Sequence, residues 1–246
     1  MQWLEIRGSE CIYKDNGGGD KLQKMRIGYD QLVKLDLGLS EEYVEQTLGA
    51  PRITGTIDLR CDTASSKLNY ARWSDPDLEV QLLYASSGKV VFLVMRLIRA
   101  GGELLFSYNG MPWRLLRSSY KDISEDHMGA FETGNARHPS YTERHYFGRL
   151  GNYHWFYFTM NVSEYLAGEI SPIELTEKAL TSDAGFSEEY VFLRSRAFPN
   201  AVGIGDDDLY PGSCFVKLYD EMMSWAELGR HLVGTFAEDF ETSLNQ

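Results

Sequence analysis

The sequence is short of the features that mark the commonest enzyme sites and membrane spans. Its 246 residues include only 3 cysteines, which lie far apart and show no Cys-x-x-Cys spacing, so a zinc or dithiol redox site is not indicated. No apolar run approaches the roughly 18 residues that a transmembrane helix needs. A glycine-rich phosphate loop, a Gly-x-Ser-x-Gly elbow and a His-Glu-x-x-His helix are also missing. We therefore expect no cofactor and favour a protein that is not an enzyme.

Basic residues are scarce in the last third of the chain. Residues 164–246 hold 5 Lys and Arg against 16 Asp and Glu, a net charge of −11 out of −12 for the whole chain. Such a surface repels phosphate backbones and anionic lipid, because nucleic-acid binding depends on a cationic surface. We expect no nucleic-acid partner and no membrane contact by this chain itself, whereas a basic protein suits the charge.

The remaining composition is that of an ordinary folded protein, with 43% hydrophobic and 13% aromatic residues. Disordered chains lack the apolar residues that offset the entropy lost on ordering. Residues 1–7 contain no long apolar segment and no cleavage-like site, so a cytoplasmic location is expected. The alternative is the soluble part of a membrane-anchored protein whose anchor lay upstream.

The clearest local signal is a complete helix over residues 40–48. Ser40 can cap the first free N–H groups, and the two glutamates that follow it lie where the helix dipole is positive. Gly49 then supplies a left-handed C-terminal residue, and Pro51 prevents continuation. A shorter helix is expected before it, over residues 29–35.

Strand patterns follow this helix. Residues 69–73, 78–84, 90–98 and 104–108 are rich in β-branched, aromatic and other apolar residues, and Ser86–Lys89 is a hairpin turn. An antiparallel sheet preceded by helices is the arrangement that this order predicts.

The same plan recurs about 84 residues later. Residues 123–137 repeat the capped helix, with Ser124 at the cap and Gly134 at the stop, and strands are expected over 141–147 and 153–160. This recurrence indicates a duplication. The alternative is independent convergence on the same capping chemistry.

Two further helices are expected. Ser171–Glu174 is a capping box, so residues 172–181 should be helical, as an insertion in the second module. Ser187–Val191 repeats residues 40–44 letter for letter, but the residues that follow look like a strand, and no third repeat is inferred. The last helix, from about 219 to 243, carries an apolar stripe that must cover something, most plausibly the sheet of one module. That stripe consists of Met222, Trp225, Gly229, Leu232, Val233, Phe236 and Phe240.

The predicted fold is α+β, a two-layer antiparallel sheet with helices on one face, duplicated, plus a long C-terminal amphipathic helix. The predicted divisions are an N-terminal segment with a Gly-rich linker (1–28), a first module (29–116), a second module with the inserted helix (117–212), and the C-terminal helix (213–246).

A family resemblance rests on residues that run in order from the first capped helix to the third strand. They are Leu37–Ser40, Val44, Leu48–Pro51, Tyr70, Trp73, Val80 and Gly88–Val90. This pattern resembles the small outer-membrane lipoproteins called SmpA or BamE, two helices on a three-stranded antiparallel sheet. Two such modules in tandem are similar to the secreted β-lactamase inhibitor protein, which grips its target with a concave sheet. The whole chain is also similar to an uncharacterised bacterial family known by a locus tag. The resemblance implies a binding surface and no transferable site residue.

Four of the 5 histidines, at positions 127, 138, 145 and 154, fall within 28 residues. A metal site needs such a concentration. If residues 148–152 form the hairpin loop, however, Tyr146 faces His154 and His145 faces Trp155, so the two strand histidines project to opposite sides. We therefore predict no metal site. The alternative functions are a metal-dependent hydrolase that uses the histidine-rich hairpin, or the soluble sensor portion of a membrane-anchored protein.

The densest aromatic segment is residues 141–158. A sheet with helices on one side needs one aromatic face for its core, and the other face is then free to bind a protein. The alternative is that the long C-terminal helix or a partner module covers that second face. Residues 206–208 add an acidic turn. The predicted protein-binding surface, of the inhibitor, immunity or assembly-accessory kind, consists of Tyr141, Tyr146, Tyr153, His154, Trp155, Tyr157, Asp206, Asp207 and Asp208.

Overall fold

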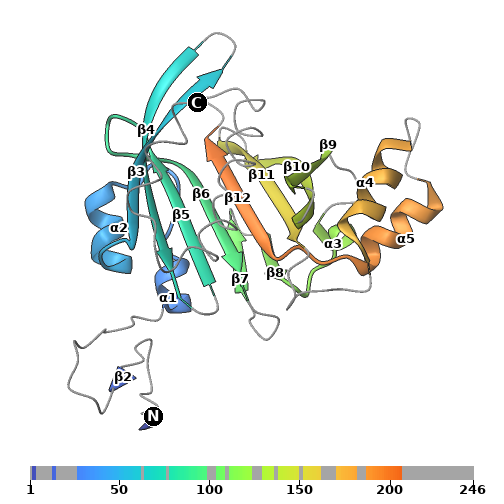
Figure 1. Ribbon diagram of the computed structural model, residues 1–246, viewed down its shortest axis with the longest axis horizontal. Coiled ribbons are helices and arrows are strands. Elements are labelled where there is room, and N and C mark those ends of the chain that lie inside the picture. The colour runs from blue at the N-terminus through green and yellow to red at the C-terminus, as the bar shows by residue number, and fades with distance from the viewer. Residues whose placement is uncertain are drawn as a thin grey trace.

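The fold is built around one large antiparallel sheet (Figure 1). The computed structural model describes residues 2–3, 13–14, 27–61, 64–75, 78–98, 104–108, 111–123, 129–135, 138–149, 152–161, 170–181 and 187–206. Eight strands follow one another in the order β3-β4-β5-β6-β12-β11-β10-β9, and every neighbouring pair is antiparallel. Their bounds are β3 (Ile53–Cys61), β4 (Ala64–Ser74), β5 (Leu78–Tyr84), β6 (Val90–Leu97), β9 (Gly129–Asn135), β10 (His138–Arg149), β11 (Asn152–Asn161) and β12 (Ala201–Asp206). With its helices, this sheet confirms the α+β class.

The helices form two groups at opposite ends of the sheet (Figure 1). They are α1 (Tyr29–Leu32) and α2 (Glu41–Leu48) beside the β3 end, and α3 (Tyr120–Ile123), α4 (Pro172–Thr181) and α5 (Glu188–Arg196) beside the β9 end. Two small hairpins complete the described elements, β1 (Gln2–Trp3) with β2 (Tyr13–Lys14), and β7 (Leu104–Tyr108) with β8 (Met111–Leu115). Within the described ranges, no helix has both the length and the apolar character required to cross a membrane.

Helix α2 begins and ends where its sequence predicts. The Ser40 hydroxyl accepts a hydrogen bond from the Tyr43 N–H at 3.3 Å, which satisfies one of the free donors of the first turn. Gly49 ends the helix at φ +80°, a conformation that costs glycine nothing. The Trp73 indole donates to the Gly49 carbonyl at 2.9 Å, so the helix end is tied to strand β4.

The two faces of the sheet have different neighbours. Directly opposed residues of antiparallel strands point to the same side, and the register therefore defines a first face that contains Leu82, Leu93 and Ile204. All five described helices, α1 to α5, contribute buried side chains to the apolar core on this face. Burial of each large apolar side chain contributes roughly 1.5–3 kcal/mol.

The opposite side, which we call the second face, is also buried over most of its width. The buried residues of this second face do not belong to the core cluster of the first face. Its residues buried to at least nine-tenths include Leu68, Tyr70, Arg72, Glu79, Gln81, Leu83, Phe92, Val94, Arg96, Ala201, Gly203, Gly205, Tyr157, Thr159, Ser140 and Thr142.

Two local predictions are wrong. Residues 129–135 form strand β9 and not the second half of a capped helix, because they pair with β10 at seven successive positions. Residues 124–128, with the predicted cap, lie outside the described residues. Ser187–Val191 begins helix α5 and not a strand, with the Ser187 hydroxyl accepting from the Tyr190 N–H at 3.2 Å. The predicted helix over 219–243 also lies outside the described residues.

Candidate functional site

The β10–β11 hairpin carries most of the predicted site residues, and its register differs from the predicted one. Pairing continues to Arg149 and Asn152, so the strands are separated by two residues instead of five. This shifts the register by one: Tyr146 faces Trp155, and His145 faces Phe156. The prediction that the two strand histidines project to opposite sides is therefore wrong, since a shift of one residue exchanges the faces of one strand relative to the other.

Three predicted site residues come together on the second face of this hairpin, Tyr146, Tyr153 and Trp155. The Tyr146 and Tyr153 rings are stacked with their centroids 5.3 Å apart, and the Tyr146 and Trp155 centroids are 4.8 Å apart. The Arg144 guanidinium lies over the Trp155 ring, 4.6 Å from its centroid. We call these four residues the aromatic row.

The aromatic row is partly open to solvent. Tyr153 is 42% exposed, and Arg144, Tyr146 and Trp155 are half-buried. Stacked rings and a cation over an aromatic face each stabilise by about 0.5–1.5 kcal/mol, so these contacts order the side chains of the row.

Tyr157 and Tyr141 do not join this exposed surface. Tyr157 lies on the second face next to the row, but it is fully buried and packs on Phe92, with ring centroids 5.9 Å apart. Tyr141 points to the first face, where it is buried against Tyr120.

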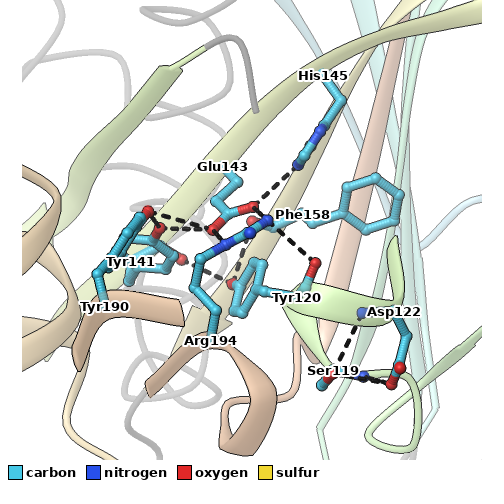
Figure 2. Close-up of polar contacts among 9 residues, drawn as sticks. All are labelled: Ser119, Tyr120, Asp122, Tyr141, Glu143, His145, Phe158, Tyr190 and Arg194. Carbon is cyan, nitrogen blue, oxygen red and sulfur yellow. Dashed lines mark hydrogen bonds and ion pairs between the residues drawn. The ribbon is translucent and has the colours of Figure 1, made fainter. Parts of the chain in front are cut away.

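Around Tyr141 a polar network lies inside the first-face core (Figure 2). Arg194 of α5 donates from Nε to Glu143 Oε1 at 2.7 Å and from Nη2 to Oε2 at 2.9 Å. The Tyr141 hydroxyl donates to Oε1 at 2.7 Å and lies 2.5 Å from the Tyr190 hydroxyl. His145 Nε2 lies 3.0 Å from Oε2, so both carboxylate oxygens of Glu143 are occupied.

Helix α3 is joined to the same network. Arg194 Nη2 donates to the Tyr120 carbonyl at 3.1 Å, and the Tyr120 hydroxyl lies 3.2 Å from the carbonyls of Tyr141 and Phe158 (Figure 2). One arginine and one tyrosine thus tie α3, α5, β10 and β11 together.

The network keeps Glu143 charged. Burial by itself raises the pKa of this carboxyl, but the hydrogen bonds from His145 and Arg194, together with the charge on Arg194, outweigh burial and lower the pKa to about 2. The same carboxylate raises the pKa of the Arg194 guanidinium against the effect of burial. Burial and the negative charge of Glu143 raise the pKa of the Tyr141 and Tyr190 hydroxyls.

This geometry suits a structural role better than a catalytic one. Glu143, Tyr141 and Arg194 are fully buried, and His145 and Tyr190 nearly so, so a substrate would reach the carboxylate only after α5 had moved. Buried ion pairs with complete hydrogen bonding tend to specify one arrangement of the elements that carry them.

His154 lies on the first face, on the same side as His145, and is buried. Desolvation raises the pKa of the Asp36 carboxyl, and the hydrogen bond from the Leu37 backbone N–H, followed by the nearby His154, opposes that rise. Over the described residues, no three His, Cys, Asp or Glu side chains gather closely enough to hold a metal ion. His127 lies outside those residues.

The acidic turn is only partly placed. Asp206 ends strand β12 opposite His154, whereas Asp207 and Asp208 lie outside the described residues. Arg144, Glu143 and Arg194 were missed by the sequence reasoning. Arg144 could have been found from the sequence, because it lies two residues from Tyr146 in one strand and therefore points to the same face. Nothing in the sequence links Glu143 with Arg194, which is 51 positions away.

Comparisons with protein-family models, with curated proteins and with solved structures each find no match to this chain.

Proposed function

We propose that this protein is a non-enzymatic binding module that captures another protein through the aromatic row. The observation that carries the proposal is the ordered, partly exposed stack of Tyr146, Tyr153 and Trp155 beside Arg144. Tyrosine, tryptophan and arginine dominate the energetics of protein interfaces, because each covers a large area and offers a polar group at its edge.

The charge of the chain supports a basic partner. The net charge of −12 resides almost entirely in residues 164–246. A negative field accelerates encounter with a positively charged protein and weakens as salt is added. Under this proposal the aromatic row supplies most of the affinity, and the acidic residues supply orientation and speed. The proposal places the protein among the inhibitor, immunity and assembly-accessory classes.

The chain offers a matched control for a test of this site. Tyr153 and Tyr43 are both 42% exposed, and Tyr43 lies on helix α2 outside the aromatic row. Wild type, Tyr153→Ala and Tyr43→Ala would each be immobilised as full-length protein, and stoichiometric capture from an extract of the native cell would be followed by titration of the purified partner. Removal of an interface anchor costs about 2 kcal/mol or more.

We expect Tyr153→Ala to weaken binding by at least roughly tenfold, while Tyr43→Ala binds as wild type does. Trp155→Ala should behave as Tyr153→Ala. Equal binding by Tyr153→Ala and Tyr43→Ala would contradict the site, and failure to recover any stoichiometric protein would contradict the function.

The alternative, a metal-dependent hydrolase at the histidine-rich hairpin, has less support. His145 and Glu143 are bound to each other inside the core. Retention on an immobilised metal column after tag removal, with loss on His154→Ala, would favour this alternative.

The predicted duplication also belongs to the proposal. The sheet consists of two successive sets of four strands, β3 to β6 and β9 to β12, and in each set the first strand lies at the edge and the last at the centre. This matching order supports two related halves.

A further inference from the structure

Strand β3 forms one end of the eight-stranded sheet, and β9 forms the other (Figure 1). Within the described part of the chain β3 pairs with one strand only, β4, at nine successive positions with no shift of register. Alternate residues of a strand direct their backbone N–H and C=O groups to opposite sides, so half of these groups in β3 point away from β4. An added strand can pair with them.

The first half of β3 is open to solvent. Ile53 is 49% exposed, and Thr54, Gly55 and Thr56 are exposed as well. Natural sheets protect such an edge with lysine, proline, a bulge or an inward-pointing charge. Residues 53–57 contain no charged residue and no proline, and their pairing with β4 contains no bulge. This stretch therefore has the properties of an edge that accepts another strand.

Residues 53–57 read the same in both directions, Ile-Thr-Gly-Thr-Ile. When two copies of β3 pair antiparallel about Gly55, isoleucine lies opposite isoleucine, threonine opposite threonine and glycine opposite glycine. A contact between two copies related by a two-fold axis needs such self-complementarity, because the same residues form both sides of it. We propose that β3 binds β3 of a second copy of this chain in this register, so that the two sheets join edge to edge.

The residue types along the stretch favour this register. Threonines directly opposite each other in a sheet form a stabilising pair, and the register contains two such pairs, Thr54 with Thr56 in each direction. The sequence also has Arg52 just before the symmetric stretch and Asp58 just after it, so the register sets positions of opposite charge opposite each other. A strand of another protein would not require a stretch that is symmetric about its centre, and the symmetry therefore identifies a second copy as the partner.

This inference does not depend on the binding function proposed above. The aromatic row lies on β10 and β11, near the other end of the sheet. Pairing through β3 therefore does not involve the row, and the two sites can be tested separately.

Disulfide trapping in the full-length protein tests the symmetric register. Gly55→Cys and Ile53→Cys would each be introduced into a protein whose 3 native cysteines are replaced by serine, and each would be incubated in a glutathione redox buffer. In the proposed register the two copies of position 55 are directly opposite, with Cα atoms about 4.5–5.5 Å apart, which a disulfide can bridge. The two copies of position 53 are about 14 Å apart, which no disulfide can bridge.

We expect Gly55→Cys to give at least roughly tenfold more disulfide-linked dimer than Ile53→Cys. Both positions are exposed, so random collision would link the two variants equally. A parallel pair of strands would also give equal yields. Equal yields, a larger yield from Ile53→Cys, or no linked dimer from either variant would overturn the inference.

Charge placed on the two threonines provides a readout that does not require a cysteine. The double variant Thr54→Lys/Thr56→Lys sets lysine opposite lysine at two positions of the pair, and Thr54→Glu/Thr56→Glu does the same with glutamate. The matched control is Glu174→Gln/Glu188→Gln, which changes the net charge as much as the lysine variant does, at exposed positions of α4 and α5. Sedimentation velocity over roughly 1 to 300 µM covers the weak association expected of a contact of a few residues per copy.

We expect wild type and the control to dimerise alike within this range, and each charged variant alone to associate at least roughly tenfold more weakly. An equimolar mixture of the lysine and glutamate variants should dimerise again, because unlike charges then lie opposite each other. A lysine variant that dimerises as wild type does, or a mixture no stronger than its components, would overturn the inference. A wild type that stays monomeric would also overturn it and would leave this edge to a strand of another protein.

Discussion

Glu143 of β10 and Arg194 of α5 are 51 residues apart in the sequence, yet they form two hydrogen bonds of 2.7 and 2.9 Å with neither side chain exposed. Buried charge is costly unless it is paired and hydrogen-bonded, and the carboxylate here also accepts from Tyr141. Helix α5 therefore has one well-defined position on the sheet, set by the guanidinium group.

Removal of Arg194 should be severely destabilising. Arg194→Met leaves the Glu143 carboxylate buried without its strongest partner, and we expect the free energy of unfolding to fall by about 3–5 kcal/mol. Arg196→Met is the matched control, because Arg196 is an exposed arginine of the same helix that lies over the Phe192 ring. Its cost should stay below about 1 kcal/mol. Urea unfolding measures both, and similar values for the two variants would contradict the role of the pair.

Acid should weaken the fold through Glu143. Its pKa is about 2 in the folded protein against an ordinary value of 4.5. Between these two values Glu143 is mostly protonated in the unfolded chain and mostly ionised in the folded chain. The stabilisation, roughly 3 kcal/mol, is complete above the ordinary pKa and is lost as the pH falls towards 2. Glu143→Gln lacks this titration. The difference in unfolding free energy between wild type and Glu143→Gln should therefore shrink between pH 5 and pH 2, and a constant difference would contradict the prediction.

A side chain at Gly203 should disturb the packing of side chains on the second face of the sheet. Gly203 lies between Val94 and Tyr157 in the register, and Gly203→Val should separate the Phe92 and Tyr157 rings at a cost of about 1–3 kcal/mol. Gly55→Val is the comparison, because a Cβ atom at Gly55 meets only the Tyr70 Cδ1 atom at 3.9 Å, an ordinary contact. Thermal unfolding measures both variants. A cost at Gly55 as large as that at Gly203 would rule out this explanation.

The two serine caps should contribute similar amounts to the free energy of unfolding. Ser40→Ala and Ser187→Ala each remove a hydroxyl that accepts from the N–H three residues later, and each should cost about 1 kcal/mol. Aspartate retains the acceptor, so Ser40→Asp and Ser187→Asp should remain within about 0.5 kcal/mol of wild type. Alanine variants as stable as the aspartate variants would show that the caps do not matter.

Elements with complete local signals were predicted well from the sequence. Helix α2, with its serine cap and glycine stop, and helix α4, with its capping box, begin and end as expected, and strand β5 matches at both ends. In each case the residues that determine the element lie within the element or next to it. The residues of strand β9 were predicted to be helical from a local capping pattern. That prediction was wrong because pairing with strand β10 decides their conformation.

The candidate site was predictable only in part. Aromatic density indicated Tyr146, Tyr153 and Trp155, but the sequence assigned Tyr141 to the same surface, and the register places it on the opposite face in the core. Tyr141 and Tyr146 lie an odd number of residues apart in strand β10, so they point to opposite faces whatever the hairpin register. The partnership of Glu143 with Arg194 has no local signal at all.

The pentapeptide Ser-Glu-Glu-Tyr-Val occurs twice, at residues 40–44 and 187–191, and both copies begin a helix with the serine hydroxyl bound to the tyrosine N–H. The sequence by itself determined that start, because capping involves only atoms within one turn. Tertiary structure decided which side of each helix is buried. Val44 is fully buried while Tyr43 is 42% exposed, whereas Tyr190 is 1% exposed and reaches Tyr141 in the core. The same five residues meet different sheet surfaces, and burial depends on those distant surfaces rather than on the local chain.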